Sequence, residues 1–269
     1  MPIKAHHKKN IYISAAVGAL ILIAGLLSLG IYPVAMVGDR FISARVWHQD
    51  FDIAQKFDPQ VDSQKAFNQM VEAIKKDELV HKLGIDQNNS EDLEWKYYRT
   101  GNEQQYSTVV NTYFSGREKL FKNYVVKPQA NDALLRIKFN SDFAANNDAY
   151  NKAQNVLTKI STGEKFEDLA KTYSDDKVSG QLGGDLGFVI VGQLIPELEK
   201  AVTSSTLGEF RKQIVISRLG YHVLFPVEST QKDGQKVWHV KHILIQTTGY
   251  DTWLNAQLQT IGVHRFMTI

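Results

Sequence analysis

The sequence contains no cysteine, only six prolines in 269 residues, and almost no net charge. Because there is no cysteine, no disulfide can staple the fold, which must be held by its apolar cores. The same absence excludes a lipid-modified cysteine as a membrane anchor. The chain has 31 Lys and Arg against 29 Asp and Glu, and this mixed composition gives no electrostatic basis for binding nucleic acid.

One long apolar run interrupts this mixed composition, at residues 11–31. At a rise of about 1.5 Å per residue, a helix of that length spans roughly 30 Å, which matches the hydrocarbon core of a bilayer. Lysines precede the run without any acidic residue, and cationic flanks stay in the cytoplasm. The sequence therefore predicts a basic cytoplasmic tail at 1–10, a single transmembrane anchor at 11–36, and an extracytoplasmic location for the rest.

A cleaved signal peptide is the alternative interpretation of the same run. The Pro-Val-Ala sequence at 33–35 would then be the cleavage region. The apolar run is longer than the ~7–15 residues of a usual signal core, which favours the uncleaved anchor.

Residues 37–130 are predicted to form a helical region. Ser43 is a suitable N-cap for a helix over 44–57, and apolar residues recur at helical spacing over 63–82. Aromatic residues concentrate between 93 and 124, which indicates further helices with an aromatic core.

Residues 131–230 are predicted to be an α+β domain built on an antiparallel sheet. Polar and apolar side chains alternate over 133–139, which predicts its first strand. The other elements expected in this domain are helices at 153–160, at 166–173 and from Pro196, then a hairpin over 213–226. The remaining segment, 231–269, is predicted to form a strand, a helix and a strand that pack back on the body.

Four short motifs follow one another in this domain. They are Ser-Asp-Asp at 174–176, Gly-Gly-Asp-Leu-Gly at 183–187, Gly-Gln-Leu-Ile-Pro-Glu-Leu at 192–198 and Gly-Tyr-His at 220–222. Their order and spacing resemble the parvulin family of peptidyl-prolyl cis/trans isomerases. The glycines of the second motif permit tight backbone geometry, and the Gly-Lys-Ser/Thr ending of a phosphate-binding loop does not follow them.

The helical region before the motifs resembles the chaperone region of SurA- and PrsA-type foldases. It opens with Val-Gly-Asp-Arg-Phe-Ile-Ser at 37–43, and helices then lead into the parvulin-like part. A helical spacer without chaperone function is the alternative for this region.

The parvulin resemblance implies a site. Asp176 falls where members of the family carry cysteine or aspartate, and His222 matches the histidine of the Gly-Tyr-His strand. The implied substrate-binding residues of the proline pocket are Leu186, Gln193, Leu194 and Leu198. Rotation about an X–Pro bond needs an apolar slot and polar groups that favour the twisted amide, but no nucleophile, metal or cofactor.

The first strand departs from the family pattern. Parvulins usually begin with His-Ile-Leu-Val, whose histidine pairs with the later one, whereas Arg136 is expected at that position here and is assigned to substrate binding. Arginine cannot accept a hydrogen bond, so the usual pair of histidines cannot form there.

The missing motif recurs later, as Lys-His-Ile-Leu-Ile at 241–245. Either 237–246 is an extra strand of the same sheet that brings His242 to the site, or it begins a second parvulin unit. The short remainder of the chain favours the extra strand, and His242 is therefore the third catalytic candidate.

Simpler interpretations of these residues remain open. Asp176 also suits a helix cap, and His222 suits a buried core position. His239 and His242 lie three residues apart on a predicted strand and point to opposite faces, which argues against a shared metal site. Ser174 does not lie in the motif that a hydrolase nucleophile requires.

Together these features predict a membrane-anchored foldase outside the cytoplasm. It would isomerise X–Pro bonds of unfolded or newly exported polypeptides without a cofactor. The alternative is a chaperone whose degenerate parvulin domain binds extended peptides but no longer isomerises them. Arg136 and Leu198 favour this alternative.

Overall fold

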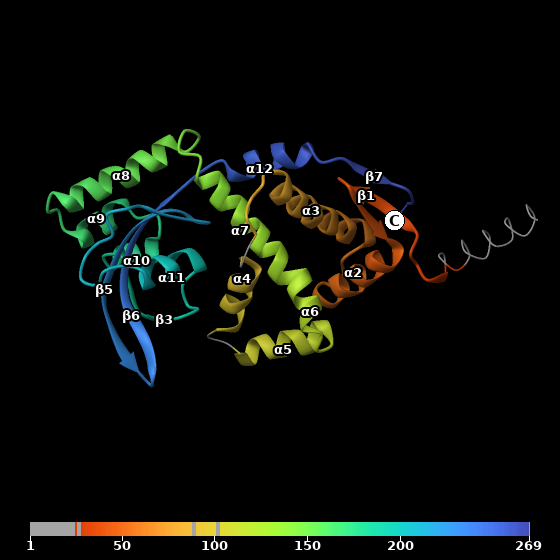
Figure 1. The fold of residues 1–269 in the computed structure, drawn as a ribbon, viewed down its shortest axis with the longest axis horizontal. Coiled ribbons are helices and arrows are strands. Elements are labelled where there is room, and N and C mark those ends of the chain that lie inside the picture. The colour runs from red at the N-terminus through yellow and green to blue at the C-terminus, as the bar shows by residue number, and fades with distance from the viewer. Residues whose placement is uncertain (1–24, 26–27, 88–89, 101–102, 269) are drawn as a thin grey trace, which may run out of the picture. The chain divides into compact units, whose positions relative to one another are not determined.

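A computed structural model of the chain describes residues 25, 28–87, 90–100 and 103–268 (Figure 1). The chain divides into two units, one of Met1–Lys75 with Thr260–Ile269 and the other of Lys76–Gln259. No helix within the described stretches is long and apolar enough to cross a bilayer. The predicted tail and most of the predicted anchor fall outside these stretches.

The first unit contains a three-stranded sheet in the order β2-β1-β7. Its strands are β1 (Pro33–Val37), β2 (Arg40–Ser43) and β7 (Val263–Arg265). Residues 33–36, which the sequence placed at the end of the anchor, therefore belong to a strand. The last strand comes from the far end of the chain and pairs with β1 in antiparallel register.

Two helices predicted from the sequence are confirmed with their bounds, α2 (Ala44–Phe57) and α3 (Ser63–Lys82). The side chain of Ser43 accepts a hydrogen bond from the Val46 amide, as expected of an N-cap. The Trp47 and Phe67 rings then meet edge to face, with centroids 5.5 Å apart, which is a favourable geometry for aromatic packing.

The second unit opens with a series of helices. They are α4 (Ser90–Arg99), α5 (Glu103–Phe114), α6 (Glu118–Phe121), the π-helical turn η1 (Lys122–Val126) and α7 (Lys127–Asn140). The predicted strand at 133–139 is wrong, because these residues complete α7. Pro128 suits the first turn of a helix, and Asn131, Leu135 and Phe139 recur every four residues on its buried side.

A four-stranded antiparallel sheet follows, in the order β3-β6-β5-β4. Its strands are β3 (Asp185–Ile190), β4 (Val215–Ser217), β5 (Gly220–Lys232) and β6 (Gln235–Gln246). The expectation that residues 237–246 form a strand of this same sheet is confirmed, and β6 lies at its centre. Asp233 and Gly234, with φ of 51° and 75°, form the two-residue turn between β5 and β6, a conformation typical of tight hairpins.

Helices cover both faces of this sheet. On one face α8 (Asn147–Ser161) and α9 (Phe166–Tyr173) pack on alternate residues of the two central strands, including Tyr221, Val223 and Ile243. On the other face α11 (Pro196–Thr203) packs on Leu224 and Val240. The short helix α10 (Lys177–Gln181) precedes β3, and α12 (Tyr250–Gln259) follows β6.

Gly184 sits where the turn after α10 meets the central strand β6. Its φ is +83°, and its carbonyl accepts the backbone N–H of His242 at 2.8 Å. A Cβ at this position would lie 2.4 Å from the His242 carbonyl oxygen. Glycine is therefore required both for the backbone conformation and for the close approach of the two segments.

We predict that Gly184→Ala lowers the free energy of unfolding more than Gly187→Ala does. Gly187 also has a positive φ, of +70°, but a Cβ there would meet nothing within 4 Å. The control should therefore lose only the backbone term of about 1–2 kcal/mol, whereas Gly184→Ala adds a clash of about 1–3 kcal/mol. Urea unfolding measures both, and equal losses would contradict the close approach.

Candidate functional site

Asp176 lies at the N-terminus of α10 and caps that helix. Its carboxylate accepts the backbone N–H groups of Val178 at 3.0 Å and Ser179 at 3.2 Å. The Ser179 hydroxyl donates to the same carboxylate at 2.6 Å, and Nε2 of His242 lies 3.0 Å from it. The helix-capping interpretation and the site interpretation of Asp176 are therefore compatible.

The two histidines predicted for the site meet across the pair of central strands. Nδ1 of His222 lies 3.2 Å from Nδ1 of His242, and the ring planes are inclined by 23°. Nε2 of His222 is 2.8 Å from the Ser217 hydroxyl. His222 is fully buried and His242 is 5% exposed, so a continuous polar network runs from Asp176 at the surface into the interior.

One arrangement of protons satisfies the contacts that link Asp176, His242, His222 and Ser217 in this network. If Nε2–H of His242 donates to Asp176, its Nδ1 accepts the Nδ1–H of His222. Nε2 of His222 then accepts the Ser217 hydroxyl proton, and that hydroxyl oxygen accepts the Leu219 backbone N–H at 2.9 Å. The assignment follows from the pattern of donors and acceptors, since a neutral imidazole has one of each.

Burial sets the charges of the network. Desolvation lowers the pKa of His222 to about 3, and the neighbouring His242 imidazole contributes to the lowering. Desolvation also lowers the pKa of His242, although the Asp176 carboxylate opposes it. Partial burial alone would raise the pKa of Asp176, but the hydrogen bonds from Ser179 and His242 outweigh it and lower that pKa to about 2. At neutral pH both imidazoles are therefore neutral and the carboxylate is ionised.

The three leucines expected in the proline pocket pack on one apolar cluster. Leu198 of α11 belongs to it, together with Leu224 on the same strand face as His222. Leu186 and Leu194 are partly buried against the same cluster. Leu198 is only 4% exposed, so it contributes to the core and not to an open slot.

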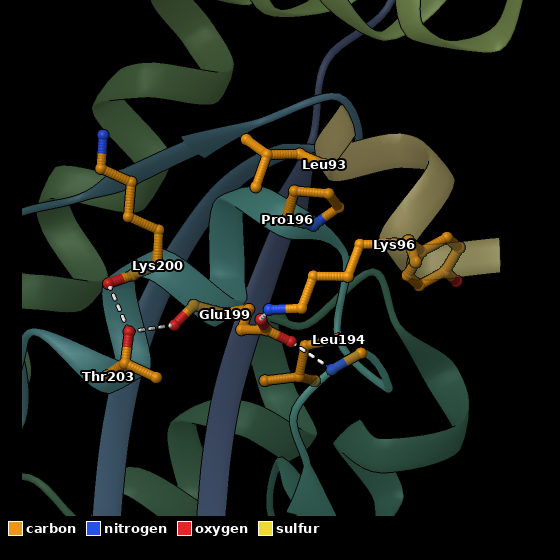
Figure 2. A pocket seen from close by; sticks show the side chains of 9 residues that line it. Leu93, Lys96, Leu194, Pro196, Glu199, Lys200 and Thr203 are labelled. Atoms are coloured by element: carbon orange, nitrogen blue, oxygen red, sulfur yellow. Dashed lines mark hydrogen bonds and ion pairs between the residues drawn. The ribbon is translucent and has the colours of Figure 1, made fainter. Parts of the chain in front are cut away.

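Leu194 also lines a pocket of about 190 Å³ on the outer side of α11. Leu93 and Lys96 of α4 face Pro196 and Glu199 of α11 across this pocket (Figure 2). The ammonium of Lys96 is 3.9 Å from the Glu199 carboxylate. One helix of the preceding region therefore forms a wall beside a predicted substrate-binding residue.

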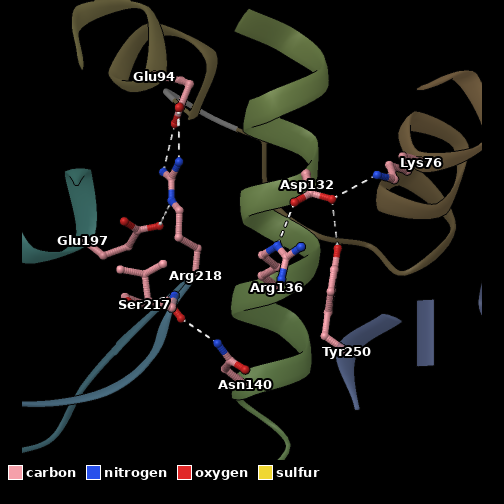
Figure 3. Close-up of polar contacts among 10 residues, drawn as sticks. Lys76, Glu94, Asp132, Arg136, Asn140, Glu197, Ser217, Arg218 and Tyr250 are labelled. Carbon is pink, nitrogen blue, oxygen red and sulfur yellow. Dashed lines mark hydrogen bonds and ion pairs between the residues drawn. The ribbon is translucent and has the colours of Figure 1, made fainter. Parts of the chain in front are cut away.

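Arg218 fixes α4 in this position. Its guanidinium bonds both carboxylate oxygens of the buried Glu94 on α4, at 2.8 and 3.1 Å (Figure 3). Its Nε also donates to Glu197 of α11 at 3.0 Å. A bidentate pair of this kind fixes orientation as well as distance.

Two of the predicted substrate-binding residues, Arg136 and Gln193, lie outside the network and the leucine cluster. Arg136 was expected on the first strand beside the histidine, but it lies on α7, bonded to Asp132 at 2.8 Å and stacked over the Tyr250 ring. Its predicted place in the sheet is wrong, because β6 fills that place. The side-chain oxygen of Gln193 accepts the Ile190 N–H at 2.9 Å and closes the turn after β3.

The alternative residues weighed from the sequence do not join the network. The imidazole of His239 bonds Asp185 at 2.8 Å, on the sheet face opposite to His242. The hydroxyl of Ser174 accepts the Leu244 N–H and contacts no imidazole. In the part of the chain that the structure describes, no group of three or more His, Cys, Asp or Glu side chains could hold a metal ion.

Ser179 and Ser217 are network members that the sequence reasoning missed. Ser179 occupies the third helical position after an Asp N-cap, which is the usual position for a reciprocal capping partner. Val215 pairs directly with His222. Ser217 lies two residues after Val215, so Ser217 and His222 point to the same face of the sheet. The hairpin register therefore contained the signal for Ser217.

Comparison with known proteins agrees with the motifs. Residues 134–226 match the family described as the PPIC-type PPIASE domain, or rotamase domain. The chain is 33% identical over 109 residues to the chaperone SurA of Nitrosococcus oceani, and 44% identical over 72 residues to SurA of Chromohalobacter salexigens. The chain therefore contains a parvulin-type peptidyl-prolyl isomerase domain. The resemblance to the parvulin family that the motifs predicted is therefore confirmed.

The chain shares only part of its length with these SurA proteins, and only part of theirs. The two alignments cover 40% and 27% of this chain, but only 25% and 16% of the SurA proteins. Among solved structures, the peptidylprolyl isomerase PrsA of Bacillus anthracis has 21% identity and a TM-score of 0.24, over 71% of this chain and 86% of that one.

The family match and the sheet differ at one strand. The match begins at residue 134, inside helix α7, and ends at residue 226, before β6 begins. The strand that bears the His-Ile-Leu motif therefore follows the rest of the domain in the sequence, although it pairs with the Gly-Tyr-His strand. Of the four strands of this sheet, the one that bears the His-Ile-Leu motif is the last in the sequence.

We predict that His222→Gln weakens the acid sensitivity of the fold. When unfolded, His222 takes up a proton near pH 6.5, whereas its folded pKa is about 3. The unfolded state thus binds more protons between these values, and stability falls as the pH drops, by up to about 1.4 kcal/mol per pH unit. Urea midpoints between pH 7.5 and 4.5 should fall less steeply in the variant.

The exposed His81 provides the control for this experiment. His81→Gln tests whether the loss of any histidine produces the same change. A variant at 222 with the wild-type slope would show that its imidazole is protonated inside the fold.

Proposed function

We propose that this protein is a foldase that isomerises X–Pro bonds of unfolded polypeptides and binds them through its helical region. The observation that carries the proposal is the continuous network from Asp176 through His242 and His222 to Ser217. It lies on the sheet face that also packs the three pocket leucines. The polar network and the leucine cluster on one sheet face support the proposal, although the strand that bears His242 follows the rest of the domain in the sequence.

The chemistry requires a polar group at the rim of an apolar surface. Amide resonance holds the peptide bond planar with a barrier of about 18–20 kcal/mol, and twisting removes negative charge from the carbonyl oxygen. Asp176 is ionised at neutral pH and its side chain is 26% exposed. A carboxylate beside a bound carbonyl oxygen destabilises the planar form more than the twisted one, which lowers the barrier.

The buried imidazoles act on the substrate only through Asp176. Their exposure of 0% and 5% keeps them from direct contact with a peptide. They orient the carboxylate and hold it in the charged form, because Nε2 of His242 bonds one of its oxygens.

We further propose the location and partners that the sequence suggests. The apolar run at 11–31 would anchor the protein in the membrane with its N-terminus in the cytoplasm, and residues from β1 onward would act outside it. The clients would be unfolded or newly exported polypeptides that contain proline. The similarity to proteins named as chaperones supports this client class.

The competing function is a chaperone that binds peptides without isomerising them. Burial of Leu198 and of both histidines favours it, because the proline slot is closed at that point. A protease-coupled prolyl-peptide assay on the purified full-length protein distinguishes the two. No acceleration at micromolar protein, with client aggregation still suppressed, would leave the binding function alone.

We predict that His242→Ala lowers kcat/KM for prolyl isomerisation about as much as His222→Ala, by about tenfold or more, because each removes one link of the network that orients Asp176. His239→Ala is the matched control, since it lies on the same strand but contacts Asp185 on the other face. The assay is the protease-coupled one, with folding checked by circular dichroism. A normal rate for His242→Ala would assign that residue to the fold alone.

A further inference from the structure

Asn140, the last residue of α7, makes polar contacts with three separate segments of the sheet. Its side-chain amide donates to the Ser217 carbonyl at 2.7 Å (Figure 3). Its side-chain oxygen accepts the Thr247 hydroxyl at 2.6 Å. Its backbone carbonyl accepts the Tyr221 hydroxyl at 2.7 Å. Asn140 is only 2% exposed, so these bonds form in the interior.

The three contacts converge on one end of the central strands. Ser217 pairs with Gly220, and Gly220 pairs with Gln246 in the next ladder. Thr247 follows Gln246 directly. The end of a helix outside the sheet therefore joins the ends of β4, β5 and β6 at the level where their pairing begins.

This end of the sheet also carries the inner half of the histidine network. The Ser217 residue whose carbonyl bonds Asn140 is the one whose hydroxyl bonds His222. The direction of that hydroxyl depends on where the backbone of residue 217 lies. A shift of the β4 end would therefore alter the hydrogen bond between Ser217 and His222, although every side chain of the network is still present.

The side chain of Asn140 does not serve as the C-terminal cap of helix α7. The amide of Asn146 already donates to the carbonyls of Phe139 and Asp142, at 2.8 and 3.0 Å. Asn146 thus serves the C-terminal end of α7, whereas the side chain of Asn140 points to the sheet. A buried amide with both ends bonded is costly to remove, because its partners then lose their hydrogen bonds in the interior.

We propose that Asn140 is a positioning residue of the isomerase site: it fixes the ends of the histidine-bearing strands and, through Ser217, sets the hydrogen bond that orients His222. This inference rests on the proposed function. It also assigns a role to residues 134–140, because the residues expected to form the first strand belong to helix α7, whose end holds that end of the sheet.

The test compares Asn140→Ala with Asn146→Ala in the full-length protein. Both remove the amide of a buried asparagine that bonds near the C-terminal end of α7, but only the Asn140 amide hydrogen-bonds to the sheet. We expect Asn140→Ala to lower kcat/KM about tenfold, with Asn146→Ala within about twofold of wild type, both measured where unfolding curves show each variant folded. Equal rates in the two variants would overturn the proposal.

A second readout does not depend on activity. Long-range ¹H–¹⁵N spectra report which imidazole nitrogen of His222 and His242 carries the proton. We expect Asn140→Ala to change the His222 pattern and Asn146→Ala to leave it as in wild type. An unchanged pattern in a folded Asn140→Ala protein would overturn the positioning role, whereas a changed pattern in a protein without isomerase activity would overturn only the proposed function.

A milder variant covers the case in which Asn140→Ala fails to fold. Thr247→Val removes one of the two side-chain bonds of Asn140 and leaves the amide on Ser217. We expect a smaller change in the same direction, about twofold to threefold in kcat/KM, with a partial shift of the His222 signals. No change in either measurement would overturn the proposal.

Discussion

The ladder between β5 and β6 is the interaction on which the second unit depends. It runs from Gly220 opposite Gln246 to Lys232 opposite Gln235, with one register shift between Pro226 and Glu228, and it sets which face the residues around the two histidines occupy. Tyr221, Val223 and Ile243 thereby face the helices α8 and α9, while His222 and His242 face the other side. Because side chains alternate, a slip of one residue would exchange the two faces. The tight turn at Asp233 and Gly234 prevents that slip.

The site contains two polar imidazole side chains that are shielded from water. Two imidazoles occupy the interior without charge, and the only ionised member of the network, Asp176, lies at the water-facing end and caps a helix. Burying a charged imidazole would cost several kcal/mol, whereas two neutral rings that exchange one hydrogen bond need no counter-ion. The network is therefore compatible with the apolar cluster around Leu198 and Leu224, which packs on the same sheet face.

The sequence was most informative where signals are local. The Ser43 cap and the spacing of apolar residues predicted α2 and α3 with their bounds, and the four motifs identified the parvulin-type domain. The strand predicted at 133–139 failed because Leu135, Ile137 and Phe139 alternate as in a strand, while the deciding factor, occupation of that place by β6, lies a hundred residues away. The contacts of Asn140 and the burial of Leu198 likewise arise from tertiary packing, which no local pattern encodes.

The position of β6 in the chain has a consequence for biosynthesis. Chains leave the ribosome from the N-terminus, and early segments begin to fold before later ones appear. In the described sheet β3 pairs only with β6, so until β6 emerges β3 has no partner and β5 has one open edge. Unpaired edges of this kind recruit other strands. A nascent chain of this protein thus passes through an aggregation-sensitive interval in which it is itself a suitable client for a foldase.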